Sequence, residues 1–423
     1  MSRRRIHVIG AGLAGLAAAV RLTEAQADVV VHEATAQAGG RCRSYYDHAL
    51  GMVIDNGNHL LLSGNHAALA FLQRIGAEHA LSGPEATQFP FVDLKTGARW
   101  TLRPNEGRFP WWVLNPSRRA PDTSARDYLV VLALLRARAG TPIAHAISSS
   151  GNAYERVWRP ILLAALNTEP AEADATLAAA VIRETLLVGG HAYRPLIARD
   201  GLSATLVDPA VRHLESCGAT VRFEHNLHAL RFDGARVSAL DFGNDVVELA
   251  PDDAVVLAVP PFIVKALVPE VATPDAFRAI VNAHFAIEPP KDFPPMIGVI
   301  NGMVEWIFAF PGRLSVTVSG ADRLLASPRE ALAETMWREV ATVAGIAKQL
   351  PAWQIVRERR ATFAALPEQN ARRPDAETRW NNLVLAGDWT QTGLPATIEG
   401  AIRSGNRAAD ILNRRGSRSA SQA

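Results

Sequence analysis

The sequence predicts an α/β protein of two domains, one of which is assembled from segments that lie far apart in the chain. Three observations lead to this fold class: a strand, glycine turn and helix pattern at the N-terminus, a buried-strand pattern with a helix after it near the C-terminus, and short alternating runs between them. With 423 residues, 48% hydrophobic and 20% charged, the chain is long enough for two cores and has the composition of an ordered globular protein.

The N-terminal pattern has the features of a dinucleotide-binding βαβ unit. An apolar stretch at 6–9 leads into Gly10, Ala11, Gly12, Leu13, Ala14 and Gly15. In this spacing the first glycine permits a tight turn, the second lets a pyrophosphate approach the backbone, and the third lets the helix lie close to the sheet. A second strand pattern is followed by Glu33 and Ala34, and a carboxylate there can accept hydrogen bonds from an adenosine ribose. We therefore expect a Rossmann-like domain.

A second glycine turn and a C-terminal motif favour FAD over NAD. Gly39, Gly40 and Arg41 can bring backbone amides and a guanidinium group to the same pyrophosphate. The strand pattern at 383–386 ends at Gly387 and Asp388, and an ordinary turn aspartate is the alternative reading of Asp388. The helix expected to begin near Ala396 or Thr397 directs its N-terminus at this point, which stabilises an anionic reduced flavin. The remaining positions assigned to the cofactor are Gly57, Asn58, His59, Leu227, Ala258, Pro395, Ala396, Thr397 and Ile398.

The order of these patterns predicts the domain organisation. We expect residues 1–65, 195–265 and 380–415 to form the FAD-binding domain, residues 66–194 and 266–379 to form an α+β substrate-binding domain with a mixed sheet and a helical cap, and residues 416–423 to be a disordered tail. Strand-like runs of a small antiparallel insert lie at 221–223, 227–232, 237–241 and 246–249, before a buried strand at 254–259. In the second domain we expect helices at 128–137, 155–166 and 328–343 and strands at 297–300, 304–310 and 314–318.

The net charge and the cysteine content limit which kinds of partner, metal site and cellular compartment the sequence supports. A net charge of +2 gives no global field for nucleic acid. Cys42 and Cys217 are too few for a disulfide framework or a metal set, so Cys42 is interpreted as a buried structural thiol. No run of about eighteen uncharged apolar residues is present to span a bilayer. The basic start, Ser2 to Arg5, together with the apolar stretch after it and Ala25 to Ala27, imitates an export signal, but cleavage at Ala27 would remove the phosphate-binding turn, so a cytoplasmic protein is expected.

Two segments suggest contacts beyond the cofactor. Asp55 and His59 flank a polar turn after a strand pattern, where either side chain can serve in proton transfer or simply hold the turn together. Trp111 and Trp112 lie in a proline-rich connection near Arg118 and Arg119, a combination that suits either a membrane interface or a buried loop anchor.

The motifs together resemble a known family. Gly10 to Gly15, Glu33, Gly39 to Arg41 and the closing segment 385–401 resemble the flavin amine oxidase and phytoene desaturase superfamily. Within it, the segments 54–62, 158–160, 164–168 and 304–308 resemble the squalene-associated FAD-dependent desaturases, also called hydroxysqualene dehydroxylases. The family pattern usually has glutamine where this chain has Asn58.

The resemblance implies a function. Hydroxysqualene, a C30 isoprenoid, would lose its allylic hydroxyl and become squalene in hopanoid precursor synthesis, with FAD as the hydride carrier. The available acids within the motifs are Asp55, His59 and Glu399, and we leave them unranked. The alternatives are an oxidative carotenoid or isoprenoid desaturase and a flavin amine oxidase. No cysteine lies near Gly387, so the resemblance implies noncovalent FAD, and the apolar substrate implies peripheral contact with the inner face of a membrane.

Overall fold

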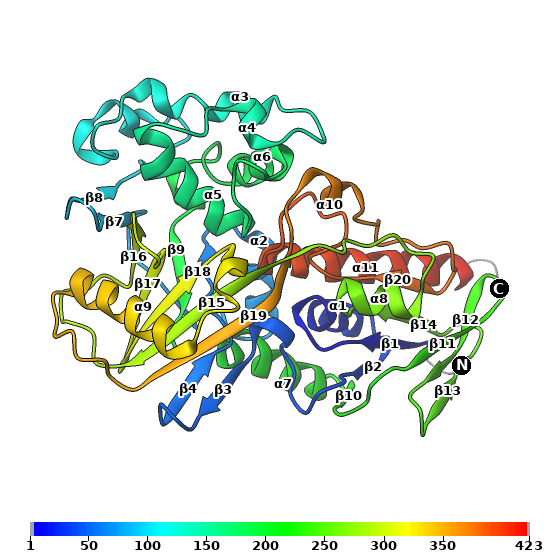
Figure 1. Cartoon of the computed structure of the whole chain (residues 1–423). Helices are drawn as coiled ribbons and strands as arrows, with labels where there is room; N and C mark the ends of the chain where they lie inside the picture. Colours follow the sequence, from blue (N-terminus) through cyan, green and yellow to red (C-terminus); the bar gives the residue numbers. More distant parts are fainter. Residues whose placement is uncertain (1–3, 421–423) are drawn as a thin grey trace.

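A five-stranded parallel sheet, with the order β10-β2-β1-β14-β20, forms the first layer of the molecule (Figure 1). The computed structural model describes residues 4–420, with side chains up to Gly416. The strands of this sheet are β1 (Arg5–Ile9), β2 (Asp28–His32), β10 (Thr220–Arg222), β14 (Ala254–Leu257) and β20 (Leu383–Leu385). They come from three separate parts of the chain, which agrees with the expected assembly of distant segments.

Both faces of this sheet are covered, which explains why its strands are almost wholly apolar. On one face Val8, Val31 and Val256 pack with helices α1 (Leu13–Glu24), α7 (Asp208–Ser216) and α11 (Ile398–Ala420). On the other face, alternate residues such as Val255 and Leu257 pack against α8 (Pro261–Leu267) and a separate three-stranded antiparallel sheet. The strands of that sheet are β11 (Ala229–Asp233), β12 (Arg236–Asp241) and β13 (Val246–Glu248).

Two boundaries of this region differ from the sequence-based expectation. The run at 221–223 belongs to the parallel sheet as β10, because Val221 pairs with Val31 of β2, and alternation alone does not reveal a strand's partner. The helix α11 continues to Ala420, so the disordered tail expected at 416–423 is wrong for 416–420, and residues 421–423 lie outside the described residues. Arg415 anchors the end of α11 by donating to the Asn381 carbonyl at 2.9 Å.

A seven-stranded mixed sheet, with the order β19-β15-β18-β17-β16-β7-β8, forms the second layer. Its strands are β7 (Phe89–Asp93), β8 (Arg99–Leu102), β15 (Phe277–Ala286), β16 (Met296–Ile300), β17 (Trp306–Phe310), β18 (Arg313–Val318) and β19 (Trp353–Phe363). Helix α9 (Arg329–Ala344) covers one face, where Trp337 packs on Phe285. The mixed sheet and the strands expected near 297, 304 and 314 are confirmed, whereas the long edge strand β19 was not anticipated because its charged residues mask the strand pattern.

Helices and short turns form a cap over the second layer, at the top of Figure 1. The cap contains the 3-10 turns η2 (Trp111–Leu114), η3 (Pro116–Arg118) and η4 (Ala125–Tyr128) and the helices α3 (Val131–Leu135), α4 (Ile143–Ala146), α5 (Arg159–Leu166) and α6 (Ala175–Glu184). The helix expected at 128–137 is therefore shorter, because a capped turn takes its first residues. The helix expected at 155–166 starts with a π-helical turn, next to Pro160, which has no amide hydrogen to donate.

Smaller elements connect the layers. They are the hairpin of β3 (Ser44–Asp47) and β4 (Met52–Asp55), the short sheet of β5 (Leu61–Leu62), β9 (Pro195–Ala198) and β6 (Leu81–Ser82), and the helices α2 (His66–Arg74) and α10 (Pro367–Ala371). The expected residue boundaries of the two domains stay a prediction. Within the described part of the chain, no helix has both the length and the apolar character needed to cross a bilayer.

Candidate active site

The glycine turn after β1 leaves one stretch of backbone open. Gly10 has a φ of +101°, and a Cβ on it would lie 2.6 Å from the Ala258 carbonyl oxygen. A Cβ on Gly15 would lie 1.9 Å from the Gly10 oxygen, so the start of α1 touches the turn directly. Around a Cβ on Gly12, by contrast, no atom of the described residues other than its chain neighbours lies within 4 Å. The first and third glycines are thus required for packing, and the second faces free space that a pyrophosphate can occupy.

The second glycine turn lies against the first. The Gly39 amide donates to the Ala11 carbonyl at 2.8 Å, and a Cβ on Gly40 would lie 3.5 Å from the Gly12 Cα. Two glycine-rich backbones therefore meet where α1 begins, with Leu13 and Ala14 in its first turn. This arrangement fits the diphosphate of a dinucleotide, because backbone amides and a helix N-terminus converge on one place.

Glu33 lies at the end of β2 beside this cradle. Its carboxylate accepts a hydrogen bond from the Ala11 amide at 2.8 Å and from the Thr35 amide at 3.0 Å. The neighbouring Ala34 is exposed, and the Glu33 carbonyl accepts from the His225 amide at 2.8 Å, two residues before the buried Leu227. The Glu33 and Leu227 segments, both assigned to the cofactor from the sequence, are thus brought together.

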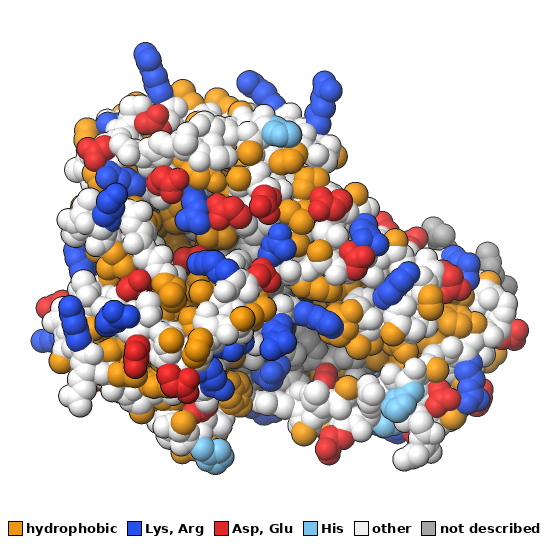
Figure 2. All heavy atoms as spheres, in the orientation of Figure 1, with side chains coloured by type: hydrophobic (Ala, Val, Ile, Leu, Met, Phe, Trp, Pro, Cys, Tyr) orange, Lys and Arg blue, Asp and Glu red, His pale blue; other side chains and the backbone are white. Residues whose placement is uncertain are grey.

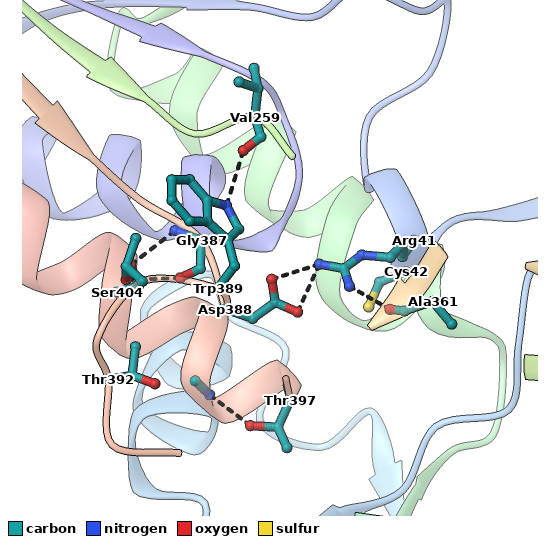
Figure 3. A network of polar contacts seen from close by, with 12 residues as sticks. Arg41, Cys42, Val259, Ala361, Gly387, Asp388, Trp389, Thr392, Thr397 and Ser404 are labelled. Atoms are coloured by element: carbon teal, nitrogen blue, oxygen red, sulfur yellow. Dashed lines mark hydrogen bonds and ion pairs between the residues drawn. The ribbon is translucent and has the colours of Figure 1, made fainter. Parts of the chain in front are cut away.

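Arg41 and Asp388 face each other across the other half of the site (Figure 3). One guanidinium nitrogen of Arg41 donates to both carboxylate oxygens of Asp388, at 2.7 and 2.8 Å, and another donates to the Ala361 carbonyl of β19. The sequence motifs are 347 residues apart, and the structure joins them. Asp388 follows β20 at the carboxyl end of the parallel sheet, the edge at which open α/β sheets bind ligands.

Arg373, which no sequence motif marks, holds the loop after β20 in place. Arg373 is buried, and its guanidinium donates to the carbonyls of Asp388 and Thr390 and to the Thr392 hydroxyl. Burial lowers the pKa of Arg373 to about 10. A single arginine in a loop carries no spacing signal, so the sequence offers no pattern from which to find it.

The C-terminal helix begins where the motif predicts. Helix α11 starts at Ile398, directly after Pro395, Ala396 and Thr397, and the Thr397 hydroxyl accepts from the Gly400 amide at 3.0 Å. Figure 3 shows Thr397 at the start of the helix that follows the Asp388 loop. The amides of the first turn that Thr397 does not cap remain available to a negatively charged ring edge.

His59 lies beside the second glycine turn. Its Nδ1 lies 2.9 Å from the Gly57 carbonyl and therefore donates to it, and its Nε2 lies 4.0 Å from the Cys42 sulfur, one residue after Arg41. Burial works against a charged imidazole, but the Cys42 sulfur, the Gly57 carbonyl and Asp55 outweigh it and raise the pKa of His59 to about 9. The expected buried free thiol at Cys42 is confirmed, and it is also the neighbour of His59.

The other two candidate acids have their oxygens engaged. Asp55 is buried, and its Oδ1 accepts from the Ser44 hydroxyl at 2.6 Å and from the Leu202 amide at 2.8 Å. Glu399 accepts from two backbone amides in the first turn of α2, at 3.0 and 2.9 Å, and from Arg403 at 2.7 Å. These contacts hold the turn and the helix in place, and they distinguish both residues from His59.

Asn58 ties the polar turn to the second layer. Its amide nitrogen donates to the Val316 carbonyl at 3.2 Å and to the Thr317 hydroxyl at 3.0 Å, both on β18. Its Oδ1 is buried, with no hydrogen-bond partner among the described residues. An unsatisfied buried acceptor next to His59 in the chain fits a site that holds a polar ring with N–H donors.

The sequence pattern that describes the family of flavin-containing amine oxidoreductases matches residues 13–413 of this chain. The chain belongs to that family. FAD is therefore the cofactor of this flavin oxidoreductase, and the assignment of the glycine cradle, Glu33, Arg41 and Asp388 to its binding stays a prediction. The fold is shared with cyclohexylamine oxidase from Brevibacterium oxydans, with a TM-score of 0.68, 15% identity and coverage of 98% of this chain and 99% of that one.

Comparison with individual proteins confirms the narrower resemblance. The flavin oxidoreductase is 59% identical over 410 residues to the hydroxysqualene dehydroxylase of Rhodopseudomonas palustris, covering 97% of this chain and 98% of that protein. It is 55% identical over 408 residues to the hydroxysqualene dehydroxylase of Sinorhizobium fredii, covering 96% and 98%.

Removing the Glu33 carboxylate should release FAD from the flavin oxidoreductase. We expect Glu33→Ala to weaken FAD binding by the loss of charge-assisted hydrogen bonds, each about 1.5–3 kcal/mol, and acid precipitation of the wild type to leave all flavin in the supernatant. Absorbance at the flavin band measures the FAD that stays with each protein after gel filtration, and it also measures the flavin in the supernatant after acid precipitation. Glu24→Ala, on the exposed end of α1, is the control. Flavin that stays with the acid-precipitated protein would contradict noncovalent binding.

Proposed function

We propose that this flavin oxidoreductase reductively removes the allylic hydroxyl of hydroxysqualene and forms squalene. The observation that carries the proposal is the 59% identity to a hydroxysqualene dehydroxylase across almost the whole chain. Reduced FAD supplies the hydride in such a reaction. The reaction balances when the hydroxyl takes up one proton and departs as water while the hydride adds to the allylic carbon.

The chain itself must supply the proton, because hydroxide is a poor leaving group. His59 is the acid that its surroundings favour, since the Gly57 carbonyl fixes Nδ1–H and leaves Nε2–H as the proton that can be transferred. A pKa of about 9 keeps this imidazole protonated at neutral pH. Asp55 and Glu399 act as positioning residues in this proposal, because donors occupy Oδ1 of Asp55 and both oxygens of Glu399, and Oδ2 of Asp55 faces the buried Arg313 at 4.0 Å.

The assay that tests the proposal is anaerobic. Wild-type enzyme reduced with dithionite and given hydroxysqualene in detergent micelles should yield squalene, identified by mass spectrometry. The oxidised enzyme under the same conditions is the control and should yield none. Formation of a more unsaturated product by the oxidised enzyme would support an oxidative desaturase instead, and turnover of amines with peroxide release would support an amine oxidase.

The substrate also suggests where the enzyme works. A C30 isoprenoid resides in lipid, so we propose a cytoplasmic enzyme that makes peripheral contact with the inner face of the membrane.

A further inference from the structure

We propose that the outer surface of the helical cap docks on an anionic lipid bilayer. The docking face consists of Phe109, Trp111, Leu114, Leu129 and Leu132. This inference rests on the proposed function only in so far as an isoprenoid substrate calls for contact with lipid; the surface itself follows from exposure and charge.

The five side chains are exposed although they are large and apolar. Their exposed fractions are 73% for Phe109, 45% for Trp111, 64% for Leu114, 57% for Leu129 and 42% for Leu132. A soluble surface usually exposes such residues singly, whereas here five fall within 24 residues of sequence. They account for a large share of the strongly exposed apolar side chains among the described residues.

The packing of the turn η2 places Trp111 and Leu114 on the outer side of the cap. Trp112 of η2 and Tyr128 of η4 are buried and meet edge to face, with ring centroids 5.2 Å apart. Since Trp111 and Leu114 are three residues apart in a 3-10 turn, they share the face opposite to Trp112. Trp112 is thus a core residue, so the suggestion that both tryptophans contact a membrane is wrong for Trp112, because its ring fills the core behind the turn.

The segment of the chain that carries the docking face is strongly basic. Residues 103–138 contain seven arginines and three acidic residues, a net charge of +4, whereas the whole chain carries +2. In the described part of the chain, the exposed arginines 108, 126, 136 and 138 form no ion pairs. Arg118 lies over the Trp111 ring, 4.6 Å from its centroid. Figure 2 shows long basic side chains standing out from the top of the cap, with hydrophobic side chains exposed between them.

This combination matches a lipid surface better than a protein partner. An exposed indole and leucines enter the boundary between headgroups and acyl chains, while nearby guanidinium groups meet lipid phosphates. The attraction of each arginine requires negative lipids, so the charge of the segment points to an anionic bilayer as the occupant.

The test is sedimentation of the FAD-loaded full-length enzyme with vesicles of phosphatidylcholine containing 30% phosphatidylglycerol, a composition chosen at roughly the anionic content that such attraction requires. The variant Phe109→Ser with Leu129→Ser should reduce partitioning by about tenfold or more, because both side chains lose apolar area. The matched control is Tyr46→Ser with Val53→Ser, since these residues are 55% and 54% exposed on the β3–β4 hairpin, far from the cap in Figure 1, and should leave partitioning unchanged.

A second variant tests the charge. Arg126→Gln with Arg136→Gln should reduce partitioning onto the anionic vesicles by roughly 30-fold, since each cation near such a surface contributes about 1 kcal/mol, and should have no effect on vesicles of phosphatidylcholine alone. Undiminished sedimentation of both double variants would overturn the proposal. So would a wild-type dimer in light scattering that Phe109→Ser with Leu129→Ser dissociates, because the face would then be a protein interface.

The design separates this inference from the proposed function. Sedimentation needs no turnover, so inactivity towards hydroxysqualene would refute the function and leave the docking result standing. Conversely, cap variants that turn over substrate from detergent micelles as fast as the wild type, but fail on substrate in vesicles, would support the docking face.

Discussion

Gly12→Ala should abolish FAD binding while leaving the protein folded. The backbone at Gly12 has a φ of −72° and a ψ of 173°, which alanine adopts freely, and the added methyl group would have no atom within 4 Å among residues 4–416, apart from its chain neighbours. The free energy of unfolding of the apoprotein should therefore change by less than about 0.5 kcal/mol. The methyl group projects into the space between the two glycine turns, where the pyrophosphate must approach the backbone, so the variant should purify without colour.

Gly15→Ala provides the contrast to this prediction. Its methyl group would lie 1.9 Å from the Gly10 carbonyl oxygen, which is backbone and cannot move aside without shifting the turn. We expect a loss of about 1–3 kcal/mol or more in the free energy of unfolding, measured by denaturant titration of the apoprotein. If Gly12→Ala kept full FAD affinity, the phosphate cradle would have to lie elsewhere.

His59→Gln should lower kcat by a factor of about 10² to 10⁴ while FAD content stays at the wild-type level. Glutamine keeps polarity near the Cys42 thiol and the Gly57 carbonyl but cannot donate an acidic proton. Single-turnover reduction of hydroxysqualene by the pre-reduced variant measures the chemical step directly.

The pH profile of the wild-type enzyme should agree with the role of His59 as the acid. Because the pKa of His59 is raised to about 9, its acid form is present below that pH and is lost above it, so activity should fall as the pH rises through about 9.

The comparison variant for His59 is Asp55→Asn. Asp55 is 4.0 Å from the buried Arg313 and holds the Ser44 and Leu202 donors, so its replacement should lower stability more than the rate of the folded enzyme. A large loss of kcat in Asp55→Asn, together with normal kcat in His59→Gln, would exchange the roles of the two residues.

The cofactor motifs were predictable because they act locally. The spacing of Gly10, Gly12 and Gly15 marks a turn within six residues of sequence, and Thr397 at the start of α11 is likewise a short-range capping signal. The parallel sheet and the mixed sheet were predictable for the same reason, because apolar runs of strand length are also local signals.

The contacts that complete the site were not predictable, because they join distant segments. Arg41 donates to a carbonyl 320 residues away in β19, and neither partner's sequence context marks the pair. The sequence indicates that Cys42 is buried, but only the fold shows that its sulfur lies 4.0 Å from Nε2 of His59. The sequence left open whether Trp111 and Trp112 are exposed or buried, and packing gives each a different answer: Trp111 is exposed and Trp112 is buried.

The long separation of β1 from β20 and α11 along the chain sets the order in which the parallel sheet can be completed. Strand β14 pairs with β1 on one side and with β20 on the other, and α11 packs along α1. Because β20 and α11 are translated long after β1 and α1, the nucleotide-binding half stays incomplete until these two elements have been made. Cofactor loading is therefore expected to follow their synthesis, and the hydrophobic strands of the unfinished sheet need shielding until then.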